Sequence, residues 1–345
     1  MPSNNEDDMI TCQGCRDLVH VDDSNWSEYD EMYRCNSCHD DHVCEMEEQE
    51  NEEEDSGLVH SYSYKPTPIF LNDDGVASYY VTASDDGTHS VLYQGFELEV
   101  EVGGRSNYMD CASSVIDTIN GRHNDIVYLK EDGSIQHGFE IVSHPMTLGF
   151  AMNHFKWEGI SNLIRKGCKS WDTDTCGLHI HLSRSAFQDE KHLFKFFKFI
   201  MDNETQMKKF AGRSSERWAS FSKEVFLNGW NDYDEDGNYV PKYGNSIMQH
   251  AKGESMNNSR YCAINLHNRK TVELRFFRPS LSPNTVKSAM QLCDAVFHYT
   301  KTECDTKRVM SANALSFRSF TSWVNTKSEY AQCADRIATR CDINN

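Results

Sequence analysis

A strict alternation of apolar and ionisable residues marks residues 95–102, GFELEVEV. Because successive side chains of a strand point to opposite faces, this stretch predicts a strand with an apolar face and with Glu97, Glu99 and Glu101 on the other face. Like charges beside one another on a strand oppose pairing unless something positive lies among them. The ordinary alternative is a half-buried antiparallel strand whose carboxylates face water.

Two other stretches put ionisable residues on one face of an apolar strand: His179 with His181, and Glu273 with Arg275. Glu140 lies among apolar neighbours after an Asp-Gly turn, so its carboxylate must face solvent or bind something. Each feature has a simpler interpretation, since a histidine is often a core residue and a Glu–Arg pair on a surface contributes little. The combination favours a shared site for metal or phosphate.

Apolar residues recur at helical spacing in five further segments. They are residues 106–120, 146–166, 186–211, 284–304 and 310–339. We expect these helices to cover the apolar face of the sheet, which gives an α+β fold of an antiparallel β-sheet with helices on one face. The ionisable face is a poor core but suits a groove for divalent metals and a polyphosphate, because Mg²⁺ prefers carboxylate oxygens and an Arg fork matches a phosphoryl group.

The N-terminal segment carries two C-x-x-C knuckles, formed by Cys12, Cys15, Cys35 and Cys38. Their spacing satisfies the preference of Zn²⁺ for four tetrahedral thiolates. Three nearby residues are alternative ligands or supporting neighbours: His39, His42 and Cys44. The segment is too short and polar to bury a core, so bound zinc would supply its folding free energy. Its acidic character favours a structural or protein-contact role over nucleic-acid binding.

The net charge and the cysteine content of the chain indicate what it can bind and in which cellular compartment it works. The chain of 345 residues has 53 Asp and Glu against 34 Lys and Arg, a net charge of −19 that opposes binding to nucleic acid or to an anionic membrane. No apolar run approaches membrane-spanning length, and the first residues do not resemble a signal peptide. We therefore expect the 13 cysteines to be thiols or metal ligands in a cytoplasmic protein.

Four motifs follow one another along the chain. They are GFELEVE at 95–101, DGSIQHGFEIVSHP at 132–145, CGLHIHLS at 176–183, and SRYCAINL followed by TVELRFF within 259–277. This ordered set resembles the carboxylate–amine ligase superfamily of glutamine synthetase and glutamate–cysteine ligase, and most closely its amidoligase branch, which is common in phage and bacterial genomes. The resemblance implies a glutamine synthetase-like catalytic fold whose sheet surrounds ATP and two or three Mg²⁺.

The resemblance also implies roles for individual residues. The implied Mg²⁺ ligands are Glu97, Glu99, Glu140, His179 and Glu273. The implied cofactor-binding residues are these five with His181 and Arg275, and the implied catalytic residues that contact phosphate are Arg275, Arg260 and His181. The chain departs from glutamine synthetase at Asn265, where that enzyme has a second Arg, and its sequence has no counterpart of the ammonia-handling loops.

The implied activity is that of an ATP- and Mg²⁺-dependent carboxylate–amine ligase. The γ-phosphate would pass to a substrate carboxylate, and an amine would attack the acyl phosphate to form an amide or isopeptide bond. The expected partners are ATP, a carboxylate substrate and an amine substrate. The substrate could be a peptide, peptidoglycan or a protein, and these alternatives stay open. Neither nucleic acid nor a membrane is an expected partner. Two alternatives stay open: a guanidino-type phosphotransferase on the same fold, and a non-enzymatic zinc-containing interaction protein.

These features divide the chain into a zinc-binding module at 1–44, an acidic linker at 45–57, an extended arm and hairpin at 58–92, and a carboxylate–amine ligase catalytic domain at 93–345. Residues 61–66 and the zinc segment resemble companions of phage-type amidoligases, which implies a bacterial or infected-host cytosol. Residues 228–258 are polar with few apolar anchors, which suits a lid over the site or, more simply, an ordinary insertion.

Overall fold

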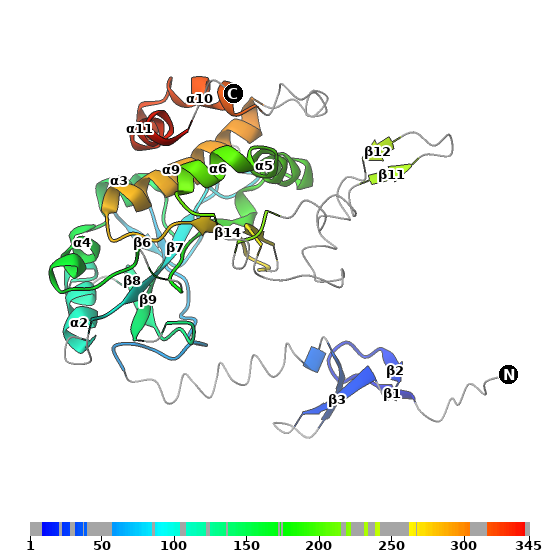
Figure 1. Cartoon of the computed structure of the whole chain (residues 1–345). Helices are drawn as coiled ribbons and strands as arrows, with labels where there is room; N and C mark the ends of the chain where they lie inside the picture. The colour runs from blue at the N-terminus through cyan, green and yellow to red at the C-terminus, as the bar shows by residue number, and fades with distance from the viewer. Residues whose placement is uncertain are drawn as a thin grey trace. The chain divides into compact units, whose positions relative to one another are not determined.

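The computed structural model describes most of the chain as two compact units, Met1–Thr67 and Pro68–Asn345 (Figure 1). The described residues are 9–20, 23–27, 32–36, 38–39, 57–84, 87–103, 108–121, 125–135, 137–171, 173, 175–214, 219–221, 231–233, 239–241, 262–266, 268–303 and 316–341. Three residues singled out above lie outside them: His42, Cys44 and Arg260. So do the acidic linker apart from Gly57 and most of residues 228–258.

The small unit consists of two short antiparallel hairpins. Strand β1 (Met9–Thr11) pairs with β2 (Leu18–His20), and β3 (Ser24–Ser27) pairs with β4 (Met32–Cys35). Among the described residues of its two hairpins, Cys12 and Arg34 are the ones that are buried. A unit with so little buried apolar surface cannot be stabilised by a hydrophobic core, as its sequence predicts.

The large unit is organised around a six-stranded antiparallel sheet in the order β13-β14-β10-β7-β9-β8. These strands are β7 (Gln94–Glu101), β8 (Val127–Lys130), β9 (Gly138–Ser143), β10 (Leu178–Ser183), β13 (Ile264–Asn265) and β14 (Thr271–Phe277). The alternating stretch forms the interior strand β7, whose Phe96, Leu98 and Val100 are fully buried. The expected α+β class and the antiparallel sheet are confirmed.

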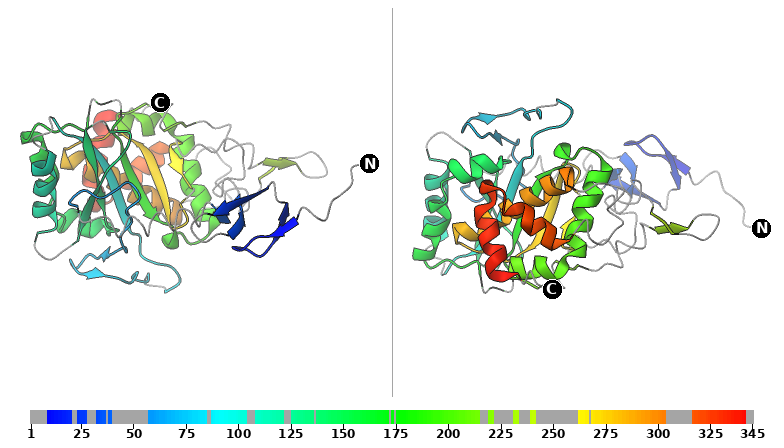
Figure 2. Two further views of the ribbon diagram at one scale, coloured as in Figure 1. Left: turned by 90° about the horizontal axis from the view of Figure 1, so that it is seen from below. Right: turned by 90° about the horizontal axis from the view of Figure 1, so that it is seen from above.

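Helices cover the apolar face of this sheet. Figure 2 shows α9 (Pro283–Thr302), α10 (Phe317–Val324) and α11 (Ala331–Arg340) behind the sheet in one view and in front of it in the opposite view. Helix α2 (Tyr108–Ile119) packs against β8 and against α4 (Glu158–Arg165). On the chain before β7, a two-stranded hairpin forms from β5 (Phe70–Leu71) and β6 (Ala77–Ser78). None of the helices within the described ranges has the length and apolar character to span a membrane.

Three segments expected to be single helices are interrupted. Residues 186–211 form α5 (Glu190–Asp202) and α6 (Glu204–Ala211) because the side chain of Asn203 bonds locally. Its Nδ2 donates to Phe199 O at 2.7 Å, and its Oδ1 accepts from Phe317 N at 3.2 Å. A short amide side chain that bonds the backbone in this way competes with helix continuation. The other interruptions separate α3 (Leu148–Asn153) from α4, and α10 from α11.

Candidate active site

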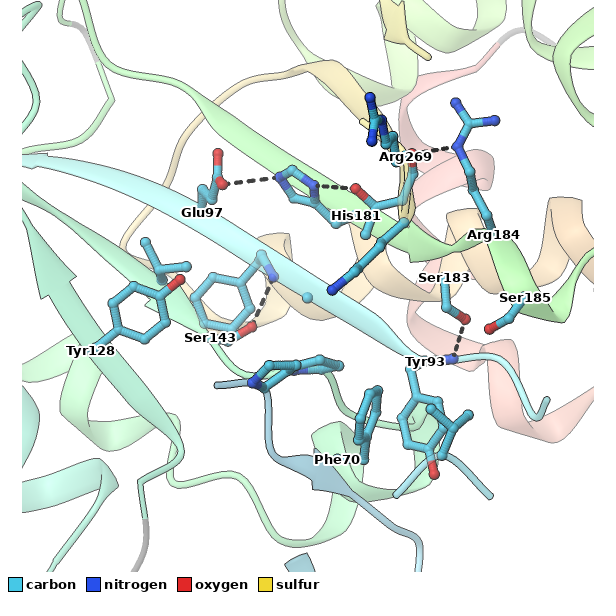
Figure 3. Close-up of a pocket in the computed structure, with 18 residues that line it drawn as sticks. Phe70, Tyr93, Glu97, Tyr128, Ser143, His181, Ser183, Arg184, Ser185 and Arg269 are labelled. Atoms are coloured by element: carbon cyan, nitrogen blue, oxygen red, sulfur yellow. Dashed lines mark hydrogen bonds and ion pairs between the residues drawn. The ribbon is translucent and has the colours of Figure 1, made fainter. Parts of the chain in front are cut away.

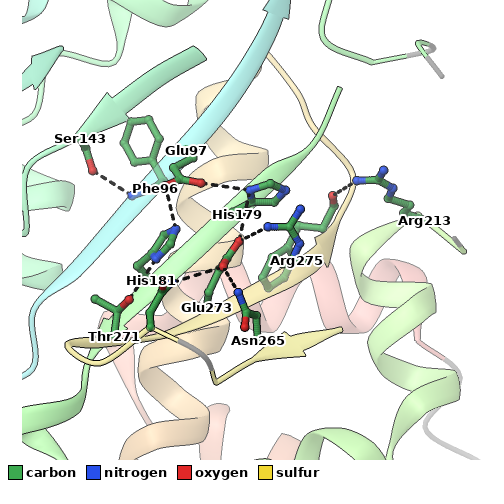
Figure 4. A network of polar contacts seen from close by, with 12 residues as sticks. Phe96, Glu97, Ser143, His179, His181, Arg213, Asn265, Thr271, Glu273 and Arg275 are labelled. Carbon is green, nitrogen blue, oxygen red and sulfur yellow. Dashed lines mark hydrogen bonds and ion pairs between the residues drawn. The ribbon is translucent and has the colours of Figure 1, made fainter. Parts of the chain in front are cut away.

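Four neighbouring strands bring the ionisable residues onto one face of the sheet, and Figure 4 shows the residues of this face that come from β7, β10 and β14. Strand β7 lies between β9 and β10, and β14 pairs with the other edge of β10. The register sets these residues opposite one another: Glu97 and His179, Glu99 and Glu140, His181 and Glu273. Opposite residues of an antiparallel pair share a face, so residues far apart in the chain form one continuous surface.

Glu97 lies at the centre of a network with both histidines (Figure 4). Its Oε2 is 3.1 Å from His179 Nδ1, and its Oε1 is 3.2 Å from His181 Nε2. Burial opposes charge on Glu97 and on His181, but their mutual attraction outweighs it. The pKa of Glu97 is consequently held well below its usual range, and the pKa of His181 is raised to about 9. Their mutual attraction thus favours a carboxylate paired with an imidazolium as long as no metal ion binds His181.

Three carboxylates form a second cluster on the same face. The oxygens of Glu99, Asp132 and Glu140 that could bind a metal lie within 4.8 Å of one another. Burial raises the pKa of Glu99, and burial together with the charge of Glu97 raises the pKa of Glu140 well above its usual range. Three neighbouring carboxylates favour ionisation only if a cation joins them. Asp132 escaped the sequence prediction because its Asp-Gly context indicated only a turn.

The residues of this face fit a divalent metal. Besides the carboxylate cluster, the metal-binding atoms of Glu97, His181 and Glu273, and those of Glu97, Glu140 and His179, each lie within 4.8 Å of one another. Glu99 is 5% exposed, and its buried Oε2 has no hydrogen-bond partner among the described residues. A buried acceptor without a donor is unfavourable, whereas a carboxylate oxygen of this kind is the ligand that Mg²⁺ prefers.

Glu273 is held by neighbours on both of its oxygens. Its Oε1 contacts Arg275 Nη1, and its Oε2 accepts from Asn265 Nδ2 at 2.8 Å (Figure 4). Asn265 thus supports Glu273. Arg213, just after α6, donates to Phe277 O at 3.4 Å and borders this face, although the sequence contained no pattern that singled it out. Arg275 Nε is buried without a hydrogen-bond partner within the described part of the chain.

A pocket of about 470 Å³ adjoins the network at the start of β7 (Figure 3). Its lining includes the aromatic residues Phe70, Tyr93 and Tyr128, the basic residues Arg184, Arg269 and Lys270, and the network residues Glu97 and His181. The guanidinium of Arg184 donates to three backbone carbonyls, two in the segment that joins β13 to β14 and one at the first residue of β14, and this segment carries Arg269 and Lys270. The pocket therefore combines apolar aromatic walls with basic residues beside the acidic face.

The small unit holds a separate candidate metal centre. The Sγ atoms of Cys12, Cys15, Cys35 and Cys38 lie within 4.8 Å of one another. Burial opposes ionisation of Cys12, but the backbone N–H groups of Cys15, Cys35 and Gly14 lower the pKa of its thiol to about 6. Four clustered sulfurs with one readily ionised thiol fit a tetrahedral Zn²⁺ site.

Comparison with known proteins identifies a family and shows remote similarity to solved structures. The family model described as "Putative amidoligase enzyme" matches residues 122–297, which is slightly more than half of the chain and runs from just before β8 into α9. A solved structure of the complex between the prokaryotic ubiquitin-like protein Pup and its ligase PafA is similar at 9% sequence identity and a TM-score of 0.33. That match covers 73% of this chain and 62% of the length of the other. No curated protein matches the sequence.

Proposed function

The chain belongs to the amidoligase family, and on that premise we propose that it is an ATP- and Mg²⁺-dependent ligase that joins a carboxylate to an amine. Membership of the family supports the ligase itself, as the motifs of the sequence led us to expect. The use of ATP and Mg²⁺, the acyl-phosphate route and the roles of individual residues are the further content of the proposal.

The observation that carries the proposal is the juxtaposition of a buried acidic face with a pocket of aromatic and basic residues. Glu99, Asp132 and Glu140 offer the oxygens of one metal site, and the carboxylates of Glu97 and Glu140 with a ring nitrogen of His179 offer the ligands of another. The adjoining pocket, walled by aromatic rings and bordered by Arg269 and Lys270, suits a nucleoside with its phosphates. Bound Mg²⁺ would offset the negative charge of the phosphates next to these carboxylates.

The residues of this face would act by positioning and by charge. The imidazolium of His181 and the guanidinium of Arg275 would donate to phosphate oxygens and hold the γ-phosphorus in line with the incoming carboxylate. In the first step a carboxylate oxygen bonds to the γ-phosphorus while the bond to ADP breaks. In the second step the amine nitrogen bonds to the acyl carbon, phosphate leaves, and the nitrogen loses a proton. Arg260 is proposed from its motif alone.

The N-terminal part completes the proposed organisation. We assign Cys12, Cys15, Cys35 and Cys38 to a structural Zn²⁺ within a module at residues 1–44, followed by the acidic linker, the arm and the catalytic domain with the boundaries predicted above. The cysteines of the described residues are free thiols, which suits a reducing compartment such as the cytoplasm.

Hydroxylamine trapping tests the reaction because hydroxylamine takes the place of the amine substrate. Acyl phosphates react with hydroxylamine to give hydroxamates, so a panel of Glu- and Asp-containing peptides is incubated with the protein, ATP, Mg²⁺ and hydroxylamine. We expect hydroxamate and one ADP per hydroxamate formed. A second panel of Arg-containing peptides supplies guanidino acceptors, and a stable phosphorylated product there without hydroxamate in the first panel would indicate the guanidino-type phosphotransferase instead. Absence of any ATP turnover across the panel, together with no nucleotide binding, would favour the interaction protein.

A further inference from the structure

The negative charge of the protein is concentrated in its N-terminal part. Residues 1–57 contain 19 Asp and Glu against two Lys and Arg, whereas residues 58–345 contain 34 Asp and Glu against 32 Lys and Arg. The first 57 residues therefore hold a charge of −17 out of the total of −19. A segment of this sign repels nucleic acid and attracts basic polypeptides, over a screening length of about 8 Å at physiological ionic strength.

Within this acidic part, the hairpin of β3 and β4 exposes large apolar side chains. The exposed fractions are 46% for Trp26, 44% for Met32 and 43% for Tyr33. Trp26 and Tyr33 are opposite each other in the β3–β4 register, and their ring centroids lie 4.9 Å apart in an edge-to-face arrangement. Because opposite residues share a face, the two rings form one aromatic surface on the hairpin.

This surface has the composition of a binding site. The cysteine quartet is the element that can hold the unit together, so the fold does not require an exposed aromatic pair. Trp and Tyr are the residues most enriched among those that dominate binding free energy at protein interfaces, since each offers a large, rigid contact area. An aromatic anchor surrounded in sequence by Asp and Glu is complementary to a basic segment with an apolar side chain.

We propose that the face formed by Trp26 and Tyr33 docks a basic, apolar-anchored segment of the polypeptide that supplies the amine. This inference rests on the proposed ligase function, because lysines provide both the positive charge that the N-terminal part attracts and the amines that such a ligase joins. Docking on the same chain raises the effective concentration of the amine for the ligase reaction. The amine substrate is accordingly a lysine-rich polypeptide rather than a small metabolite.

Fluorescence anisotropy with three labelled peptides tests this surface on the full-length, zinc-loaded protein without nucleotide. The probes are a Lys-Gly peptide with Leu anchors, the same peptide with Ser in place of Leu, and a version with Glu in place of Lys. We expect the first probe to bind best. The double substitution Trp26→Ser/Tyr33→Ser should weaken that binding roughly tenfold or more. Tyr79→Ser/Tyr80→Ser, which changes aromatic residues that are 69% and 83% exposed on the large unit, should leave it unchanged.

Several results would overturn the docking surface. Equal binding of the Leu and Ser peptides, or equal loss in both double variants, would show charge attraction without an aromatic site. Tighter peptide binding or a lower melting temperature of the large unit in Trp26→Ser/Tyr33→Ser would show that the chain itself covers this face. Titration of the same protein with Mg²⁺ and a non-hydrolysable ATP analogue separates the two proposals. Nucleotide binding without peptide binding rejects the docking surface alone, and peptide binding without nucleotide binding rejects the ligase.

Discussion

Gly177, directly before β10, is a position where one added methyl group should disturb the site more than the fold. A Cβ at this residue would lie 2.8 Å from His179 Nε2 and 3.5 Å from Arg213 Nη1. A contact below 3.0 Å forces a movement, and the imidazole that must move is 7% exposed and bonded to Glu97 through Nδ1 at 3.1 Å. Gly177→Ala should therefore displace His179 from the carboxylates around it.

The two consequences of this displacement differ in size. Overpacking by one methyl group costs about 1–3 kcal/mol of stability, so the fold should persist with a lower melting temperature. A misplacement of about 1 Å at a catalytic group can cost roughly 10²-fold in rate, so hydroxamate formation should fall by about that factor. Calorimetry and the hydroxylamine assay measure the two effects separately.

Gly133 offers a matched control in the Asp-Gly turn. A Cβ at Gly133 would meet no atom within 4 Å, so Gly133→Ala should keep both activity and stability. Wild-type hydroxamate formation by Gly177→Ala would refute the argument that the glycine is needed to place His179. A loss of the same size in Gly133→Ala would show that the effect is not specific to the imidazole.

Three further predictions concern stability. Cys12→Ser should release zinc and abolish the dispersed NMR signals of residues 9–39, because the metal supplies the folding free energy of the small unit. The melting temperature of the large unit should stay unchanged. Retained order of the small unit after zinc loss would contradict a structural role of the metal. Arg184→Ala should lower the free energy of unfolding in urea by about 1–3 kcal/mol, because three backbone carbonyls lose a half-buried donor; an unchanged value would show that water replaces it. Burial lowers the pKa of His192 from 6.5 to about 4, so the folded state binds this proton less tightly and stability should fall from pH 6.5 toward pH 4, by up to about 3 kcal/mol. His192→Gln should flatten that part of the urea-denaturation profile, and an unaltered slope would assign the loss to other groups.

Period-two alternation was sufficient to predict which face each residue of β7, β10 and β14 occupies. It could not predict the register, because a shift of two residues keeps every side chain on its face while changing its neighbours. The structure sets Glu97 opposite His179 and Glu99 opposite Glu140, which decides which residues share a cluster. The Glu273–Arg275 pair illustrates the same limit, since only the sheet shows that Glu273 is 3% exposed.

Residues outside regular alternation were the ones that the sequence did not reveal. Asp132 belongs to the carboxylate cluster through the fold of its turn, and Arg213 approaches the site from the end of a helix. Asn203 interrupts the helical pattern of 186–211 because its side chain bonds Phe199 and Phe317, and the second of these lies more than a hundred residues away in the chain. Such contacts depend on tertiary structure and leave no local periodic pattern.

The most direct test of the account is a calorimetric titration of the folded, zinc-loaded protein with Mg²⁺ and a non-hydrolysable ATP analogue. Glu99→Gln removes a carboxylate of the buried cluster, and Glu101→Gln is the control. Glu101 lies on the same strand and accepts a hydrogen bond from Thr175 Oγ1 at 3.1 Å. It belongs to none of the possible metal-binding clusters of the described residues. We expect the wild type and Glu101→Gln to bind the nucleotide and Glu99→Gln to lose binding while keeping its fold. Equal binding by Glu99→Gln would contradict the assigned site, and no binding by the wild type would favour the zinc-containing interaction protein.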